Sequence, residues 1–483
     1  MMEDTNPKFS NVNGNNINQN ENNTTSAILD ILENELYEKN LIKDKIDRDI
    51  LNKVDVIGFD LDFTLAVYRI EEFTQLMYNA FARFLVEQKN YPKEILIFTP
   101  NEENLDSKCN LEEKEKNRKF NYDFVHRFSG IEVVIDFING NAVKIDENRV
   151  VIKAYHGIDE MTQEQIEGTY GAEKEFTEIH MDSAKGNNYH SILNNFEYHA
   201  VPIFLMCVHL LDIGSFKINE PEPYRRIFED ILEAAMFNYN LFDAKDNRIM
   251  NMRESNGYFF NEFEKNPKKY LLDYSAKEML IHLRKKGIKV FFATNSFFEF
   301  ADVILKTTIG DDYLDYFDLA VYYSQKPTFF YSDNKANAYF PDLSKKDHKG
   351  DAVTEENLKE QPTFDRLKKE KTIIQGSYHI VEEFFRQTIQ KKDLKFIYVG
   401  DNLFTDIYHS SSLPNWASIG VLDEINTGFL GSTPQDFKKM WKLEQKVLGV
   451  EVQEPRTNSF FTKMSREKNL FSVSNVETLK YLN

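Results

Sequence analysis

Short apolar runs that alternate with helical stretches constrain the fold of this chain more than any other feature. The first run, Val54 to Phe59, is rich in β-branched residues, as expected of a strand buried in a parallel sheet. Three later runs have the same character: Ile288 to Ala293, Leu319 to Tyr322 and Leu394 to Val399. Helical stretches lie between them, at Ser275 to Lys286 and at Tyr378 to Gln387. This alternation predicts an α/β fold with a doubly wound parallel sheet.

Two long stretches interrupt the alternation and suggest how the chain is divided. Residues 128–267 begin with β-like segments and continue into helical ones, and the stretch is long enough to be an inserted cap. Residues 331–371 are crowded with Lys, Asp, Glu and Asn, which is typical of a mobile, charged surface excursion. The core would then consist of residues 45–127 and 268–483.

The N-terminal residues fall into two parts. Residues 1–25 are polar and rich in Asn, with little to bury, and predict a disordered tail. Residues 26–44 carry apolar side chains at helical spacing and predict a helix. This helix either packs on its own domain, which is the simpler interpretation, or docks onto a partner.

Charge restricts the classes of partner. The chain has 78 acidic and 59 basic side chains, and its formal net charge is -19. Such a surface repels phosphate backbones and anionic lipids, so we expect neither nucleic acid nor a membrane as a partner. A small anionic substrate remains possible, because a metal ion and one or two buried cations can reverse the local potential.

Cysteine usage and hydropathy bear on the compartment. The two cysteines, Cys109 and Cys207, indicate neither a disulfide framework nor a zinc site, which fits a reducing environment. The N-terminus lacks the apolar stretch of a signal peptide, and no run of about 18 uncharged apolar residues occurs. We therefore expect a cytoplasmic protein.

A D-x-D-x-T string follows the first predicted strand, at Asp60-Leu61-Asp62-Phe63-Thr64. Two carboxylates at positions i and i+2 just past a strand can reach one space while the backbone turns. One of them can then attack an electrophile while the other transfers a proton. Acidic chains produce such strings by chance, but the position after a buried strand favours a functional site.

Polar residues also follow the other predicted strands. Thr294-Asn295-Ser296 offers a hydroxyl, an amide and backbone N–H donors for phosphate oxygens. Lys326 offers a charge that could pair with Asp60 and with a phosphoryl group. Asp401 offers an oxygen ligand for Mg²⁺, and Asp406 could orient it from behind.

Each of these residues has a structural explanation when taken alone. Thr294 can cap a helix, Lys326 can be a solvated charge, and the two late aspartates can belong to a loop and a cap. A nucleophile, an acid/base, a hydroxyl, a cation and a metal carboxylate that all follow strands favour catalysis when taken together.

Longer strings around these residues resemble the haloacid dehalogenase superfamily, and within it the cytosolic 5'-nucleotidases of the purine, IMP/GMP type. The strings are Gly58 to Tyr68, Ala293 to Ser296, Tyr316 to Leu319, Lys326 to Phe330 and Tyr398 to Ile407. Lys153 to Gly157 and Asn458 to Phe461 are also similar. The resemblance extends from about residue 45 to the C-terminus and implies a Rossmann-like core with an inserted cap.

The resemblance also implies a mechanism. Asp60 would attack phosphorus and form an aspartyl phosphate, while Asp62 would serve as general acid and then as general base. Mg²⁺ would be held by the Asp60 carboxylate, the Asp62 backbone carbonyl and Asp401. Thr294 and Lys326 would bind the remaining phosphoryl oxygens, with Asn295 and Ser296 close to the substrate.

The base-binding region departs from the family pattern. Members that act on purine nucleotides have an aromatic–Asn pair in the cap region, and Asn195 and Phe196 lie near the matching position. They also have an Arg and an Asp, where this chain has Leu232 and Met236. Purine specificity is therefore not implied. A later departure, Asn415-Trp416-Ala417-Ser418 in place of Gly-Trp-Arg-Thr, is expected to affect packing rather than chemistry.

Two functions from different classes remain open. The first is an active Mg²⁺-dependent 5'-nucleotidase, which the intact catalytic set favours. The second is a protein of the same fold that serves as a structural or interaction subunit, which the altered base region and the Asn-rich tail favour. A homo-oligomer or a place in a larger assembly is compatible with either function.

Overall fold

The computed structural model of the chain describes residues 50–97, 125, 133–146, 148–176, 186–192, 195–239, 243–244, 247–248, 251–421, 471–473 and 476–481. The predicted tail at 1–25, the predicted helix at 26–44 and the stretch Asn458 to Phe461 lie outside these residues. Cys109 also lies outside them, whereas Cys207 is a buried free thiol.

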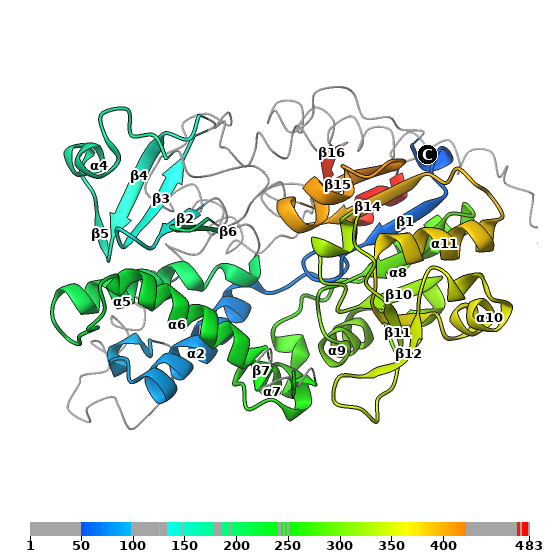
Figure 1. Cartoon of the computed structure of the whole chain (residues 1–483), viewed down its shortest axis with the longest axis horizontal. Coiled ribbons are helices and arrows are strands. Elements are labelled where there is room, and N and C mark those ends of the chain that lie inside the picture. Colours follow the sequence, from blue (N-terminus) through cyan, green and yellow to red (C-terminus); the bar gives the residue numbers. More distant parts are fainter. Residues whose placement is uncertain are drawn as a thin grey trace, which may run out of the picture.

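The larger sheet contains, within the described ranges, nine strands in the order β12-β11-β13-β10-β9-β1-β14-β15-β16 (Figure 1). Four adjacent strands are those that the sequence predicts: β10 (Leu319–Tyr322), β9 (Lys289–Ala293), β1 (Val56–Phe59) and β14 (Phe396–Gly400). Three further parallel strands flank them: β13 (Thr372–Gln375), β15 (Trp416–Val421) and β16 (Phe471–Val473). The predicted α/β fold with a parallel sheet is confirmed.

Helices cover both faces of this sheet, which explains why its strands are apolar throughout. Alternate side chains of β1 point to opposite faces, so Ile57 and Phe59 enter one core cluster and Val56 the other. The helices that cover the sheet on the side of the first cluster include α8 (Lys277–Lys285) and α9 (Phe298–Thr308). Those of the second are α10 (Gln361–Glu370) and α11 (Tyr378–Ile389). The helix predicted at Ser275 to Lys286 corresponds to α8, and the helix predicted at Tyr378 to Gln387 corresponds to α11.

A smaller antiparallel sheet comes from the stretch 128–267, with the strand order β5-β4-β3-β2-β6. Its strands are β2 (Val133–Asp136), β3 (Asn141–Ile145), β4 (Val151–His156), β5 (Asp159–Glu160) and β6 (Tyr189–Ile192). The helices of this stretch are α4 (Gln163–Tyr170), α5 (Ala200–Asp212), α6 (Pro223–Asn238) and α7 (Phe259–Lys265). A short ribbon of β7 (Asp243–Ala244) and β8 (Asn247–Arg248) separates the last two. In Figure 1 the smaller sheet lies to the left of the larger one, above α5 and α6.

Helix α2 (Ile70–Lys89) packs against helices of the stretch 128–267 (Figure 1). Lys89 forms an ion pair of 2.5 Å with Glu233 of α6, and the Tyr91 hydroxyl donates to Asp230 Oδ2 at 2.9 Å. The sequence analysis places α2 in the core, with residues 45–127. In the structure, these contacts join α2 to the helices of residues 128–267.

The charged stretch 331–371 is more ordered than the mobile excursion that the sequence predicts. It contains β11 (Ala338–Pro341) and β12 (Lys349–Val353), which extend the larger sheet in antiparallel fashion, and then α10. Alternate residues of β11, Ala338 and Phe340, are buried beneath the charged surface. The alternation of buried and exposed side chains in β11 spans only four residues, so it is not recognisable in a sequence stretch rich in charged residues.

The order of strands explains where ligands would bind. After β1 the chain continues through β9, β10 and β13 on one side, and then crosses back to β14 and β15 on the other. In open α/β sheets such a reversal leaves a crevice at the carboxyl ends of the strands beside it. The predicted site residues follow these strands. Within the described parts of the chain, no helix is both long and apolar enough to cross a bilayer.

Candidate active site

The D-x-D-x-T string forms a tight turn at the end of β1. The Asp60 amide donates to Val399 O at 2.8 Å, which ties the start of the turn to β14. The amides of Leu65 and Ala66 both donate to Leu61 O at 2.9 Å, and Phe63 has a positive φ of 56°. This turn directs Asp60 and Asp62 into one pocket, which both residues line.

Lys326 lies at the centre of the site. Its Nζ is 2.7 Å from Asp60 Oδ1 and 2.7 Å from Asp406 Oδ1, and it donates to the Tyr398 hydroxyl at 3.0 Å. The Lys326 side chain is only 2% exposed. Burial lowers the pKa of Lys326, but Asp406 and Asp60 outweigh burial and raise it well above its usual value. Lys326 therefore keeps its positive charge.

Asn295 holds the loop that carries Lys326. Asn295 Oδ1 accepts from Lys326 N at 2.6 Å, and Asn295 Nδ2 donates to Lys326 O at 2.9 Å. The Ser324 hydroxyl donates to the same Asn295 oxygen at 3.1 Å. The sequence predicts Asn295 as a substrate contact, and the structure gives its amide this structural contact at the edge of the pocket.

Asp62 accepts two hydroxyl hydrogen bonds. Tyr68 donates to Asp62 Oδ1 at 2.5 Å, and Ser296 donates to Asp62 Oδ2 at 2.6 Å. Burial and the nearby charge of Asp60 raise the pKa of Asp62 to about 7, although both hydroxyls oppose the rise. A carboxyl group with this pKa can give and take a proton near neutrality.

Three carboxylates meet beside Lys326. Oxygens of Asp60, Asp401 and Asp406 lie within 4.8 Å of one another. Burial and the charges of Asp60 and Asp406 raise the pKa of Asp401 well above its usual value, and burial raises the pKa of Asp406 to about 6. One lysine leaves this cluster with excess negative charge. An all-oxygen donor set of this kind could hold a hard metal ion.

Gly400 makes this arrangement possible. A Cβ at Gly400 would lie 2.5 Å from Asp406 Cβ, so any other residue would push Asp406 away. Asn402 begins the π-helical turn Leu403–Tyr408, and its Oδ1 accepts from two amides of that turn. The Asn402 amide donates in turn to Asp406 Oδ2 at 3.1 Å. The turn after β14 thus fixes Asp406 at the floor of the site.

A pocket of about 550 Å³ extends from these carboxylates toward the helices of the stretch 128–267. Thr294, buried at the end of β9, also lines it, and its Oγ1 accepts from Ser296 N at 3.0 Å. Phe196 also lines the pocket. The centroid of its ring lies 5.9 Å from that of Tyr68 and 5.5 Å from that of Phe63. The side chain of Asn195, the other predicted base contact, lies outside what the structure describes.

Comparison with known proteins identifies the family. A model of the 5' nucleotidase family matches residues 48–106 and 96–470. The chain belongs to the 5' nucleotidase family. This confirms the resemblance to the cytosolic 5'-nucleotidases, and membership supports a phosphohydrolase that acts on nucleotides.

Three relatives of the family are similar over most of this chain. Human "5'-nucleotidase domain-containing protein 1" is 28% identical over 397 residues, which cover 81% of this chain and 76% of that protein. The Bos taurus protein of the same name is 27% identical over 376 residues, covering 77% and 72%. Rattus norvegicus "5'-nucleotidase domain-containing protein 2" is 23% identical over 385 residues, covering 78% and 58%.

The structure brings the predicted residues together, but it gives Asn295, Ser296 and Asp406 contacts other than those predicted. Asp60, Asp62, Thr294, Lys326 and Asp401 all line one pocket. Asp406, predicted behind the metal site, supplies an oxygen to the carboxylate cluster itself. Ser296, predicted as a substrate contact, donates to Asp62. Among the described residues, the Asp62 carboxylate is not part of the cluster of candidate metal ligands.

Two tyrosines in the site were missed by sequence reasoning. Tyr68 contacts Asp62, and Tyr398 lies between Lys326 and Ala293 O, to which its hydroxyl donates at 2.7 Å. Tyr398 lies within an apolar strand and Tyr68 just after the turn, so both resemble ordinary core aromatics. The only signal was that each belongs to a string that resembles the family.

Proposed function

We propose that this protein is a Mg²⁺-dependent 5'-nucleotidase that hydrolyses nucleoside 5'-monophosphates through an aspartyl phosphate. The observation that carries the proposal is the meeting of Asp60, Asp401 and Asp406 with Lys326 at one end of the pocket. A haloacid-dehalogenase-type core, with residues 128–267 as its cap, belongs to the same proposal. The crossover beside β1 supports that core.

In the first step, an Asp60 carboxylate oxygen attacks phosphorus and the ester P–O bond breaks. Asp62 gives its proton to the leaving oxygen, so the nucleoside departs as a neutral alcohol. The pKa of about 7 supports this role, because part of Asp62 is protonated at neutral pH. Tyr68 and Ser296 hold the Asp62 carboxylate while it acts.

In the second step, water attacks phosphorus of the aspartyl phosphate and the bond to Asp60 breaks. Asp62 takes the proton from this water, which restores both carboxyl groups and releases inorganic phosphate. Lys326 and the Thr294 hydroxyl bind phosphoryl oxygens throughout. Lys326 Nζ, 2.7 Å from Asp60 Oδ1, also orients the Asp60 carboxylate for the attack.

The metal belongs with the carboxylate cluster. Asp60 and Asp401 would hold it together with the backbone carbonyl of Asp62, and Asp406 would lie beside it. A bound Mg²⁺ would supply positive charge to the phosphoryl oxygens during transfer. The hard oxygen donors and the excess negative charge of the cluster support this choice.

Phosphate release from a panel of nucleoside 5'-monophosphates, with and without Mg²⁺, tests the proposal. We expect turnover that requires Mg²⁺ and disappears with EDTA. Acid-quenched protein should retain labelled phosphate that hydroxylamine releases. With 4-nitrophenyl phosphate, whose leaving group needs little protonation, Asp62→Asn should accumulate more of it because the second step lacks its base. A wild-type protein without Mg²⁺-dependent turnover would instead favour the structural or interaction subunit. A cytosolic location belongs to the proposal and is tested by fractionation of cells.

A further inference from the structure

A buried pair of polar side chains joins the charged stretch 331–371 to the wall of the pocket. His348, in the loop between β11 and β12, places its Nε2 3.1 Å from Glu299 Oε1 in the first turn of α9. Glu299 is 1% exposed and His348 is 6% exposed. Figure 1 shows α9 next to this hairpin and next to α7. The loop therefore buries a polar ring inside the protein instead of exposing it to solvent.

The backbone of the loop fixes the direction of the His348 ring. His348 has a positive φ of 51°, its carbonyl accepts from Asp342 N at 2.8 Å, and its amide donates to Lys345 O at 3.2 Å. Its ring contacts that of Phe298 edge-on, with centroids 6.2 Å apart. A residue with a side chain adopts this left-handed conformation uncommonly, and it persists only where the surrounding contacts hold it. The hairpin is thus built to present this ring to α9.

Glu299 lies between residues that form the pocket. Phe297 and Phe300, on either side of it in the chain, both line the pocket. So does Met252, which begins the 3₁₀ turn η4 (Met252–Glu254) at the end of the stretch 128–267. The turn and α9 are in contact. A shift of the Glu299 carboxylate would therefore move this part of the wall.

Electrostatic attraction holds the Glu299 carboxylate in place. Among the described residues, neither of its oxygens accepts a hydrogen bond of good geometry. Burial raises the pKa of Glu299, while its own amide, His348, Arg253 and the Met252 amide oppose the rise. The carboxylate is thus stabilised from the hairpin, from the start of α9 and from η4 together.

The other charges beside the buried pair already have partners. Arg253 forms an ion pair of 2.8 Å with Glu264 of α7. Lys346 of the hairpin lies 3.6 Å from Glu254 of η4, and both of these side chains are exposed. The hairpin and η4 therefore have a second link at the surface, which provides a matched control for the buried one.

Stability alone gives little reason for a buried polar pair at this place. Apolar side chains of similar size often stabilise a core as well as a buried ion pair does, because burial removes water from both charges. Removing one partner is costly, since the other then remains buried without compensation. Such a pair also tolerates only a narrow geometry, whereas apolar side chains can repack. The pair therefore restricts how the hairpin, α9 and η4 fit together.

We infer that Glu299 and His348 are positioning residues, through which the β11–β12 hairpin holds the first turn of α9 and the turn η4 in the arrangement that forms the pocket wall. The charged stretch 331–371 thereby shapes the site, although the described residues that line the pocket include none from it. The activity assay below rests on the proposed function, whereas the positioning itself rests on the contacts of the pair.

The test compares His348→Leu with His348→Gln, which keeps an N–H donor for Glu299. For the best nucleoside monophosphate of the panel, we expect His348→Leu to raise KM at least about fivefold and to keep kcat within about twofold, because the wall contacts bound ester but not the reacting groups. His348→Gln should keep both constants within about twofold of wild type. Lys346→Ala, which removes only the exposed link, should do the same.

Leu367→Ala separates positioning from stability. Leu367 is buried in α10 and does not line the pocket, so its truncation should lower Tm without changing KM. The double variant Glu299→Gln with His348→Leu leaves no buried charge unpaired, so it should fold even if His348→Leu does not. It should still raise KM at least about threefold. An unchanged KM in the variant that folds, or an equal rise in Leu367→Ala, would overturn the inference.

Hydrogen exchange separates this inference from the proposed function, because it requires no turnover. We expect amides of residues 251–254 and 297–301 to exchange at least about tenfold faster in His348→Leu or in the double variant than in wild type, and not in Lys346→Ala. Without turnover of any ester, this result would retain the positioning and reject the nucleotidase. Turnover with unchanged exchange and KM would retain the nucleotidase and reject the positioning. Without turnover and without a change in exchange, both would be rejected.

Discussion

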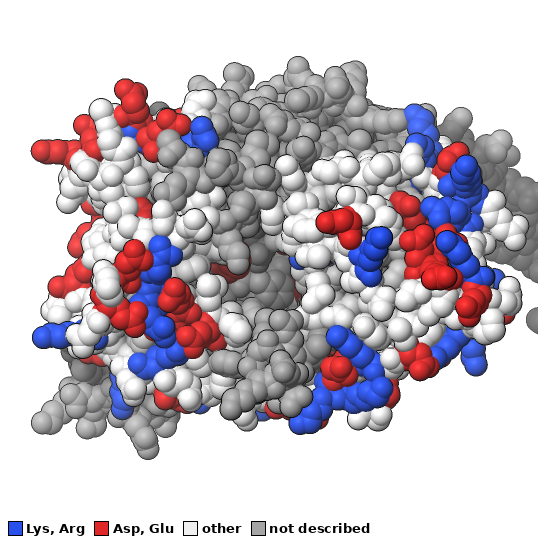
Figure 2. Space-filling view, in the orientation of Figure 1, with Lys and Arg blue, Asp and Glu red and all other residues white. Residues whose placement is uncertain are grey.

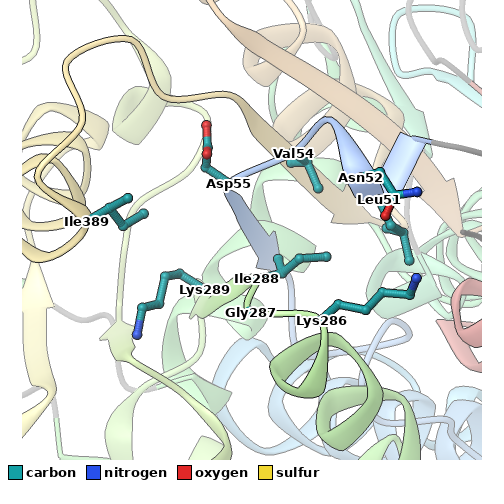
Figure 3. Close-up of a pocket in the computed structure, with 9 residues that line it drawn as sticks. All are labelled: Leu51, Asn52, Val54, Asp55, Lys286, Gly287, Ile288, Lys289 and Ile389. Atoms are coloured by element: carbon teal, nitrogen blue, oxygen red, sulfur yellow. The ribbon is translucent and has the colours of Figure 1, made fainter.

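The two ends of β1 and β9 carry similar kinds of residues but arrange them in opposite ways. At the carboxyl ends, Asp60 and its neighbours converge on Lys326 and share one buried pocket. At the amino ends, a smaller pocket of about 290 Å³ is lined by Asp55, Lys286 and Lys289 among others. Figure 3 shows the ammonium groups of these two lysines pointing away from each other.

Charges at the amino ends are paired locally. Both oxygens of Asp55 lie 2.8 Å from Lys391 Nζ, and Asp55 Oδ2 also accepts from Lys395 N at 2.8 Å. Lys289 pairs with Asp318 at 3.0 Å. Figure 2 likewise shows acidic and basic side chains interspersed over the visible face of the molecule. Paired and exposed charges of this kind stabilise a fold modestly and perform no chemistry.

At the carboxyl ends, the structure holds more carboxylates than cations. Three acidic groups there have raised pKa values because they are buried beside one another. Folding alone gives no reason to gather them, and perturbed groups in a pocket are typical of functional sites. The difference between the two ends thus teaches that unbalanced charge, rather than charge itself, marks the site.

Replacing one aspartate at each end of β1 by asparagine should give the largest difference in kcat. Asp60→Asn should lower kcat for nucleoside monophosphates by at least about a thousandfold, because an amide cannot act as the nucleophile. Asp55→Asn loses only the partly exposed contacts with Lys391 and Lys395, outside the pocket, and should keep kcat within about twofold. Phosphate release at saturating substrate measures both. If Asp60→Asn kept a tenth of the wild-type kcat, Asp60 could not be the nucleophile.

Replacing the buried Lys326 and the partly exposed Lys289 should give the next largest difference in activity. Lys326→Met removes the cation that pairs with Asp60 and Asp406, and we expect kcat/KM to fall about 100- to 1,000-fold. Lys289→Met breaks a pair with Asp318 that is partly exposed, and should have little effect. Circular dichroism of both variants checks the fold, and Lys326→Arg provides a version that keeps the charge. Half of wild-type activity in Lys326→Met would contradict a role for this lysine in phosphate binding.

Removing one hydroxyl should have a smaller but diagnostic effect. Tyr68→Phe loses the hydrogen bond to Asp62, and we expect kcat to fall about tenfold, since the general acid is less well oriented. The loss should be greater for phenyl phosphate than for 4-nitrophenyl phosphate, because the poorer leaving group depends more on the proton from Asp62. Tyr91→Phe removes a similar hydroxyl contact, to Asp230, and neither of these residues lines the pocket. An equal loss for both esters would leave Tyr68 with a packing role only.

The smallest expected effects are on thermal stability. Removing a carboxylate should raise Tm at the carboxyl ends of the strands and should not raise it at the amino ends. Because the folded pKa values of Asp62 and Asp406 are raised to about 7 and about 6, folded protein binds more protons than unfolded protein. Stability without metal should therefore fall as pH rises from about 4 to about 7. At pH 8, Asp401→Asn should raise Tm by roughly 1–3 °C, because one of three crowded carboxylates is replaced by a neutral amide.

The matched variant at the other end is Asp55→Asn, which should lower Tm slightly or leave it unchanged. Differential scanning fluorimetry with and without Mg²⁺ measures both variants. Mg²⁺ should raise the Tm of wild-type protein and should do so less for Asp401→Asn. A lower Tm for metal-free Asp401→Asn would show that the carboxylate cluster is not a source of instability.

Much of the site was predictable because it depends on a local pattern and one topological rule. The strings after β1, β9, β10 and β14 are contiguous, and parallel strands bring their carboxyl ends to one edge. The ordered part of 331–371 was not predictable, because two short strands are too brief for their alternation to stand out among charged residues. The association of α2 with α6 depends on contacts such as Tyr91 with Asp230, which are remote in sequence.

The sequence by itself determined the α/β class, the strands of the sheet centre and the five residues that meet at its edge, because apolar periodicity and the position after a strand are local properties. Only the tertiary structure decided that Asp406 joins Asp60 and Asp401, that Tyr68 and Ser296 hold Asp62, and that Leu232 faces the pocket while Met236 does not. These facts depend on distances between side chains from different elements. Such distances are fixed only when the elements pack together.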